Sequence, residues 1–242
     1  MPEPTLKGIR TILRSSGDPQ RALGTARFFK TGRGEYGEGD KFLGIRVPDL
    51  RRIVRAHRGL SLADTLALLQ SGWHEERAVA LLLLVDAHAR GSATEKRQIH
   101  REYLANTRYI NNWDLVDSSA GEIVGSHVPE RGTGFLEKLA RSNSLWERRI
   151  AMIATFWSIK HDDFAPTLRI AEQLLDDEHD LIHKAVGWML REAGNRDVTV
   201  LRAFLDTHAA TMPRTALRYA IERLGPDDRR RYMGAKADVA RT

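Results

Sequence analysis

Apolar residues recur along the chain at intervals of three and four. One example is the set Ile150, Ile153, Ala154 and Trp157, which fits one face of a helix. No alternating pattern of the kind that strands show stands out. The pattern predicts helices over Thr5–Arg14, Pro19–Phe29, Pro48–Ala56, Leu62–Gln70, Trp73–Ala89, Thr94–Leu104, Asn112–Val124, Phe135–Arg141, Leu145–Ile159, Ala165–Leu175, Leu181–Ala193, Val198–His208 and Pro213–Leu224.

A faint internal repeat runs through these helices. The segment beginning at Trp73 resembles the one beginning at Trp146, and apolar residues open similar segments at Trp113 and Leu181. The gaps between these four anchors are 40, 33 and 35 residues. Two-helix units of this length stack into repeat arrays of the HEAT type. We therefore predict an all-α fold, a HEAT-like α-α superhelix of antiparallel helix pairs, with an irregular helical bundle as the alternative.

The whole chain, residues 1–242, is expected to form a single repeat domain. Residues 30–41 interrupt the helical pattern, because four glycines in a short stretch disfavour a helix. This Gly-rich loop either touches a ligand or simply connects two helices. The stretch Asp227–Thr242 is charged and weakly patterned, so we expect it to fray.

Composition narrows the function classes. The 242 residues carry a net charge of +6, and arginine dominates the basic residues, which favours a polyanionic partner. The chain has no cysteine, which excludes disulfides and thiolate chemistry. Its longest aliphatic run, Val79–Val85, is too short to span a membrane, and its start lacks the features of a signal peptide. The expected location is the cytoplasm.

Trp113 and Asp117 form the first candidate for chemistry. If a helix begins at Asn112, these two residues lie one turn apart on the same face, while Leu115 and Val116 point into the core. The indole and the carboxylate then stand together, partly outside the core. The alternative is a core tryptophan beside a solvated helix charge.

A second candidate lies in one later helix. Lys184, Trp188 and Arg191 share a face, and an aromatic ring between cations is typical of a surface that binds nucleic acid. Alternatively, the aliphatic stems of the basic residues simply cover the indole. Further arginine pairs that fit a phosphate-binding groove are Arg148 with Arg149 and Arg214 with Arg218, although isolated pairs of this kind are usually solvated.

Other chemistries find little support. The nine histidines show no metal-binding spacing, no glycine-flanked nucleophilic serine is present, and no phosphate-binding or dinucleotide fingerprint occurs. We therefore expect neither a metal nor a cofactor.

Taken together, these segments resemble the AlkD-type alkylpurine DNA glycosylases, a family built of HEAT-like repeats. The resemblance covers most of the chain, and its joint order and spacing are specific. It rests on Phe42–Pro48 with Arg51 and Arg52, on Trp113–Asp117, on Trp146–Arg149 with Ala151, and on Lys184–Trp188 with Leu190–Glu192.

The resemblance implies a concave, positively charged groove for double-stranded DNA that contains N3- or N7-alkylated purines. A groove that must accept DNA favours a monomer. The resemblance also implies that Trp113, Trp188 and Asp117 flank the deoxyribose of the damaged nucleotide, and that Arg149, rather than Arg148, steadies a phosphate. The family works from the DNA backbone without a base pocket, and no base-binding constellation stands out here. The remaining residues expected to contact DNA are Lys184, Arg191, Arg46, Arg214 and Arg218.

The implied chemistry is self-consistent. An N3- or N7-alkylated purine is already cationic and leaves without a general acid, while the sugar gains positive charge that Asp117 stabilises. Two departures from the family pattern concern substrate range: Asn112 replaces a tryptophan, and the Gly-rich loop is longer. Two alternatives stay open: a catalytically silent binder of damaged or structured DNA, and a helical scaffold for other proteins.

Overall fold

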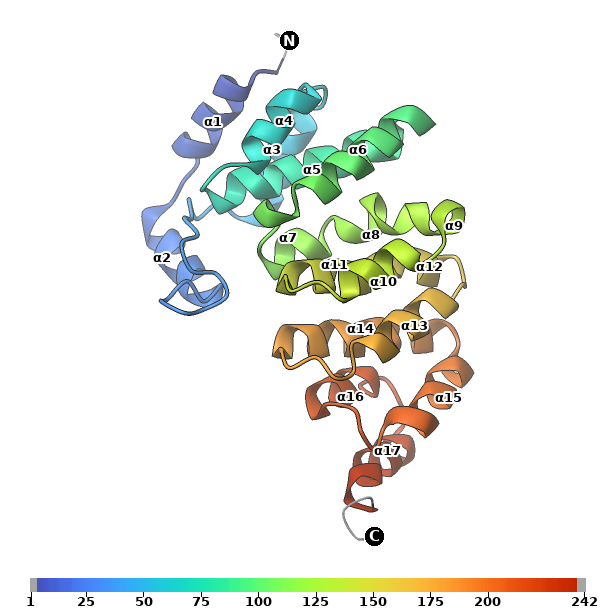
Figure 1. Cartoon of the computed structure of the whole chain (residues 1–242). Helices are drawn as coiled ribbons and strands as arrows, with labels where there is room; N and C mark the ends of the chain where they lie inside the picture. Colours follow the sequence, from blue (N-terminus) through green and yellow to red (C-terminus); the bar gives the residue numbers. More distant parts are fainter. Residues whose placement is uncertain (1–3, 239–242) are drawn as a thin grey trace. The chain divides into compact units, whose positions relative to one another are not determined.

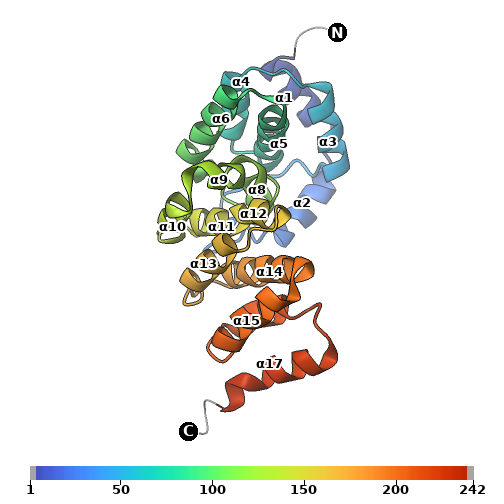
Figure 2. The same ribbon diagram turned by 90° about the vertical axis from the view of Figure 1, so that its right-hand side faces the viewer.

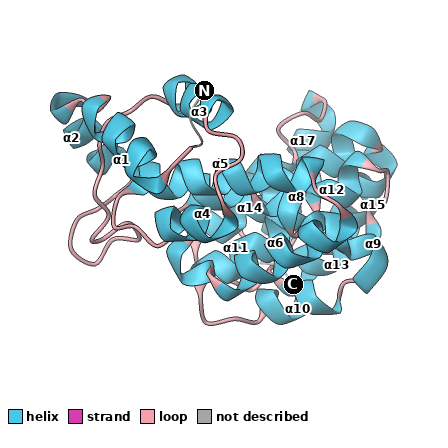
Figure 3. Ribbon diagram, turned by 90° about the horizontal axis from the view of Figure 1, so that it is seen from above, coloured by secondary structure: helices cyan, strands magenta, loops and turns pink. Residues whose placement is uncertain are grey.

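The computed structural model describes residues 4–238, and these residues fold into helices joined by turns (Figure 1). Within this range no strand forms, and one isolated bridge joins Lys41 to Trp73 (Figure 3). The all-α prediction is confirmed. The chain divides into two compact units, Met1–Ile123 and Val124–Thr242, which are described separately below.

A central helix organises unit 1. The 17-residue helix α5 packs against α1, α3, α4, α6, α7 and α8, and Figure 2 shows α1, α3, α4 and α6 around it. Its side chains Val79, Leu81 and Leu84 are buried in the core of the unit. The elements of unit 1 are α1 (Leu6–Ser15), α2 (Pro19–Phe28), α3 (Val47–Ala56), α4 (Leu62–Leu69), α5 (His74–Arg90), α6 (Ala93–Ala105), the 3₁₀ turn η1 (Thr107–Tyr109), α7 (Trp113–Asp117) and α8 (Ala120–Ile123).

Unit 2 is arranged around α14, also 17 residues long, which packs against α11, α12, α13, α15 and α16. A methyl group at Gly187 would lie 2.3 Å from the Ala216 carbonyl oxygen, so glycine permits the close approach of α14 to α16. The elements are η2 (Gly125–His127), α9 (Val128–Arg131), α10 (Gly134–Ala140), α11 (Leu145–Ala154), α12 (Phe156–Lys160), α13 (Ala165–Gln173), α14 (Asp180–Arg196), α15 (Val198–His208), α16 (Arg214–Ala220) and α17 (Pro226–Asp238).

The four repeat anchors mark equivalent places in the fold. Trp73 caps the start of α5, Trp113 begins α7, and Trp146 and Leu181 lie in the first turns of α11 and α14. The faint periodicity therefore reflects the starts of four helices, two in each unit, whose buried faces belong to the core of their own unit.

Two predicted helices are broken, and hydroxyl side chains explain both breaks. Ser118 and Ser119, between α7 and α8, both donate to the Leu115 carbonyl oxygen, at 3.2 and 2.6 Å. Thr155, between α11 and α12, donates to the carbonyl oxygen of Met152 at 2.8 Å. Such hydroxyls compete with the helical hydrogen bonds.

The structure also corrects the expectation for the C-terminal stretch. Residues predicted to fray belong to α17, where Tyr232 is buried and its hydroxyl donates to Asp206 at 2.9 Å. Residues 239–242 of that stretch lie outside the described range. No helix that the structure describes is long and apolar enough to cross a bilayer.

Candidate functional site

Helix α7 presents Trp113 and Asp117 as the sequence predicted. The Asn112 side chain caps the helix by accepting from the Trp113 backbone N–H at 2.9 Å. Leu115 and Val116 are fully buried, whereas Trp113 and Asp117 are half-buried. The indole and the carboxylate therefore lie one helical turn apart on a face that solvent reaches.

Asp117 lies beside a buried tyrosine. Burial raises the pKa of Tyr103, and the nearby charge of Asp117 raises it further. The Tyr103 hydroxyl pairs with Ser119 Oγ at 2.9 Å, and Ser119 in turn donates to the Leu115 carbonyl oxygen. These bonds fix the turn that follows Asp117 and so restrict where its carboxylate can point.

Trp113 belongs to a cluster of rings. Its indole stacks on Phe29 at a centroid distance of 5.3 Å and meets the edge of Phe28 at 5.9 Å. Phe29 stacks on Phe42 at 5.3 Å, and both phenyl rings lie within 5 Å of the His74 imidazole, at 4.9 and 4.6 Å. The cluster gives the start of α7 a rigid aromatic support.

A cavity of about 890 Å³ opens beside this cluster, entirely within unit 1. Side chains of α2, α3, α5 and α7 line it, and its volume is that of a small-molecule site. The sequence analysis found no base-binding constellation. It also did not predict this cavity, which lies beside Trp113 and has aromatic side chains in its lining. Arg46, a predicted DNA contact, lines the same cavity and pairs with Asp49 at 3.2 Å.

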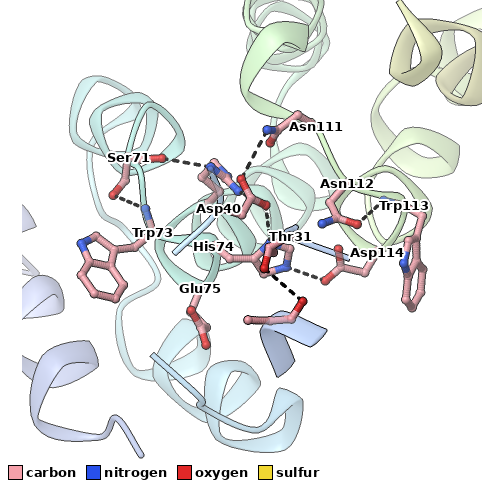
Figure 4. Close-up of polar contacts among 12 residues, drawn as sticks. Thr31, Asp40, Ser71, Trp73, His74, Glu75, Asn111, Asn112, Trp113 and Asp114 are labelled. Atoms are coloured by element: carbon pink, nitrogen blue, oxygen red, sulfur yellow. Dashed lines mark hydrogen bonds and ion pairs between the residues drawn. The ribbon is translucent and has the colours of Figure 1, made fainter. Parts of the chain in front are cut away.

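Figure 4 shows a cluster of charged side chains in which His74 contacts both Asp40 and Asp114. His74 is 3% exposed, and its ring nitrogens pair with Asp114 at 2.8 Å and with Asp40 at 3.4 Å. Arg77 also pairs with Asp40, at 2.7 Å. Burial by itself lowers the pKa of His74, but the hydrogen bonds to the two carboxylates outweigh burial and raise it to about 9. His74 is therefore an imidazolium at neutral pH.

The same network perturbs Asp40. Burial acts to raise the pKa of Asp40, but the hydrogen bond from His74 and the charge of Arg77 lower it below its ordinary value. Asp40 stands at the end of the Gly-rich loop, whose N–H groups at Gly32 and Gly34 donate to the loop's own Glu35 and Glu38. The loop is therefore held by its own side chains, and it ends at the buried carboxylate of Asp40.

Glu75 holds the backbone of the segment Phe42–Pro48 in place. Its carboxylate accepts from the N–H groups of Leu43, Gly44 and Ile45 at 2.8, 2.7 and 3.3 Å. Gly44 has a φ of +77°, and a methyl group there would lie 2.3 Å from the Asp18 carbonyl oxygen. Glycine therefore permits both the backbone conformation and the close approach of the segment to the start of α2.

Sequence reasoning missed these buried charges. The signal available was the run His74-Glu75-Glu76-Arg77 at the start of an otherwise apolar helix. All four are buried, and Glu76 pairs with Arg10 and Arg14 at 3.1 and 2.7 Å. Charges that enter a core require partners, but the run does not say which residues supply them.

In unit 2, the basic face predicted around Trp188 also carries acids. The indole N–H of Trp188 donates to Glu192 at 2.9 Å, Lys184 pairs with Asp180 at 2.8 Å, and Arg191 pairs with Glu192 at 3.4 Å. Arg191 also pairs with Glu222. The predicted basic side chains therefore have acidic partners in the free protein, and Trp188 is half-buried. Nucleic-acid binding by this face stays a prediction.

The arginines predicted to bind phosphate also have partners within unit 2. Arg149 is 4% exposed and donates to the Leu181 carbonyl oxygen at the start of α14. Arg148 pairs with Asp177 at 2.6 Å, and Arg214 donates to the Met233 carbonyl oxygen at 3.0 Å. Arg218 is exposed on α16. Phosphate binding by these residues stays a prediction, and for Arg149 it requires exchange of an internal bond.

The fold is similar to that of a solved structure, and the sequence matches a family model. A solved structure described as a predicted DNA alkylation repair enzyme from Enterococcus faecalis superposes with a TM-score of 0.67, at 17% identity over 87% of this chain and 98% of that chain. This likeness shows the same α-α repeat fold. A search of curated proteins finds no match. The sequence model of the family described as DNA alkylation repair enzyme matches residues 9–224, and the chain therefore belongs to this family.

Proposed function

We propose that the protein is a monomeric DNA glycosylase that hydrolyses the N-glycosidic bond of N3- or N7-alkylated purines in double-stranded DNA. The electron pair of the bond between sugar C1′ and the base nitrogen passes to the cationic purine, which leaves as a neutral base. The oxygen of a water molecule bonds to C1′, and a water proton is released. The alkyl group supplies the charge that makes the base a leaving group, so the reaction needs no general acid.

The pairing of Trp113 with Asp117 on one solvent-reached face of α7 carries this proposal. As the sugar gains positive charge, the Asp117 carboxylate attracts it. At about 4 Å and an effective dielectric constant near 20, this attraction is worth on the order of 4 kcal/mol. The end of α7, where Asp117 lies, also favours a cation because the helix dipole is negative there. The indole of Trp113 faces the sugar cation with its π surface and excludes water.

In this proposal the other predicted residues contact the sugar or the phosphate groups of the DNA. Trp188 provides a second indole face, and Arg149 contacts a phosphate, supported by Arg148, Lys184, Arg191, Arg46, Arg214 and Arg218. Most of these cations pair with carboxylates or carbonyl groups in the free protein. We therefore expect DNA phosphates to replace some of these internal partners when DNA binds.

The decisive experiment measures release of 7-methylguanine from a duplex that carries one such base. We expect the wild type to release it, and Asp117→Asn to release it roughly a thousandfold more slowly with similar duplex affinity. Asp176→Asn is the matched control, because it removes an exposed carboxylate from a turn of unit 2. Tight duplex binding without release by the wild type would favour the silent DNA binder. The absence of both binding and release would favour a scaffold.

A further inference from the structure

Helix α7 is too short to hold its own orientation. It comprises five residues, beginning with Trp113 and ending with Asp117. A helix of little more than one turn gains few internal hydrogen bonds, so its position depends on contacts with the rest of the unit. The buried side chains Leu115 and Val116 supply part of that contact. Another part comes from Asp114, which directly follows Trp113 and pairs with a histidine of α5.

That histidine, His74, supports Trp113 in two ways. Its Nε2 donates to Asp114 Oδ2 at 2.8 Å, as Figure 4 shows, so it holds the residue that follows Trp113. Its ring also lies 4.9 Å from that of Phe29, which stacks on the Trp113 indole at 5.3 Å. One buried side chain therefore supports both the backbone and the ring of Trp113.

Asp114 depends on His74 as the partner of its charge. Its Oδ2 pairs with His74, whereas its Oδ1 is buried and accepts no hydrogen bond from any residue that the structure describes. Asp40, the other carboxylate at His74, also pairs with Arg77 and accepts from the Asn111 amide at 3.4 Å. A partly buried carboxylate without a cation is unstable, so loss of the contact with His74 is expected to shift α7 until water reaches Asp114.

We propose that His74 is a positioning residue for the glycosylase reaction, which fixes helix α7 so that Trp113 and Asp117 face the sugar. His74 is 3% exposed, so it acts through its neighbours and touches neither DNA nor the reacting atoms. The role rests on the proposed function, since it concerns the residues that the proposal assigns to the sugar. It requires no pocket for the base.

The test measures single-turnover release of 7-methylguanine from a duplex saturated with protein, and duplex affinity in a separate titration. We expect His74→Gln and Asp114→Asn each to slow release by about tenfold or more, because a displacement of about 1 Å can cost about a hundredfold in rate. Duplex affinity should fall by no more than about twofold, since phosphate contacts dominate it. The double variant should be no slower than the slower single variant, because both changes remove the same contact. Additive effects on the rate would overturn the inference.

Glu76→Gln is the matched control. Glu76 is a buried carboxylate of the same helix, but it pairs with Arg10 and Arg14 of α1. Its loss should lower the free energy of unfolding in urea but leave the release rate within about twofold, because α7 keeps its position. If Glu76→Gln slows release as much as Asp114→Asn does, His74 has only a structural role and the inference is overturned.

A second readout does not depend on excision. Labelling with 5-fluorotryptophan gives a fluorine NMR signal for each of the five tryptophans, and Trp113→Phe identifies the signal of Trp113. We expect His74→Gln and Asp114→Asn to shift or broaden this signal, and Glu76→Gln to leave it in place. Circular dichroism checks that each variant folds. The Asp114 side chain is 28% exposed, so Asp114→Asn is the more readily tolerated change and suffices if His74→Gln does not fold.

The two readouts separate this inference from the proposed function. Release by the wild type, with a Trp113 signal that does not respond to changes at His74 or Asp114, would refute the positioning role alone. A Trp113 signal that responds to both changes, without any release by the wild type, would support the positioning of α7 and refute the proposed activity.

Discussion

The buried imidazolium at His74 makes the stability of the protein depend on pH in a defined window. His74 pairs with Asp114 and Asp40, and these carboxylates hold its pKa at about 9 in the folded protein. In the unfolded chain the pKa is the ordinary value of about 6.5. His74→Gln removes the titrating charge and keeps a side chain that can form hydrogen bonds.

The sign follows from the raised pKa. Below about pH 6.5 His74 is charged in both states, and its stabilisation is fully present. As pH rises from about 6.5 to about 9, the unfolded chain loses the proton while the folded protein keeps it, so the stabilisation declines, and above about 9 it is lost. Each pKa unit corresponds to about 1.4 kcal/mol, so the difference of about 2.5 units is worth on the order of 3 kcal/mol.

The assay is urea unfolding of the wild type and of His74→Gln at several pH values between neutral and about 9, followed by near-ultraviolet circular dichroism. Between pH 7 and pH 9 the free energy of unfolding of the wild type should fall relative to the variant by about 2 kcal/mol, because part of the total change lies outside this interval. Two other groups do not interfere. The lowered pKa of His179 acts at the acidic side, and the raised pKa of Tyr103 acts above the ordinary tyrosine value.

A difference between wild type and variant that stays constant across the window would refute the reasoning. It would mean that His74 titrates at its ordinary pKa in the folded protein, and that the contacts with Asp114 and Asp40 do not hold its proton. A difference that grows with pH would reverse the sign and imply that burial dominates over the carboxylates.

Three further predictions concern the supports of the site. Gly44→Ala should destabilise the protein by more than about 2 kcal/mol, because the added methyl group collides with the Asp18 carbonyl oxygen at a position of positive φ. Gly59→Ala is the control, since Gly59 also has a positive φ but no described atom lies within 4 Å of the added methyl group, and it should cost less. Thermal unfolding compares the two variants. Glu75→Gln should cost about 1–3 kcal/mol in urea unfolding, because a neutral amide replaces the carboxylate that accepts three N–H groups. Arg149→Ala should weaken duplex binding and reduce the salt slope by about one phosphate contact; an unchanged slope would remove Arg149 from the phosphate contacts.

Helical periodicity predicted most of the fold because the core is made of helix faces. Helix α15 begins and ends where the pattern placed it, at Val198–His208. The pattern failed where side-chain hydroxyls decide the backbone. Nothing in the apolar spacing of Asn112–Val124 reveals that Ser118 and Ser119 turn onto the Leu115 carbonyl group and end the helix.

The candidate site was predictable only in its local part. Trp113 and Asp117 are close because they are four residues apart on one helix, which spacing alone conveys. The partners of His74 lie 34 and 40 residues away along the chain, at Asp40 and Asp114. No local pattern links such residues, since their proximity depends on how the Gly-rich loop and α7 are both placed against α5.

The sequence allowed two interpretations of Trp113, a core tryptophan or a candidate site residue, and the structure shows that the two are compatible. As a core residue it stacks on Phe29, and as a candidate site residue it is half-buried and lines a cavity. A ring held on one face by other rings is rigid, and rigidity is what a residue must have to position a reacting sugar. The packing of Phe29 and Phe42 on the His74 imidazolium extends that support to the buried carboxylates. Loss of the His74 charge is therefore expected to loosen the wall of the cavity as well as the fold.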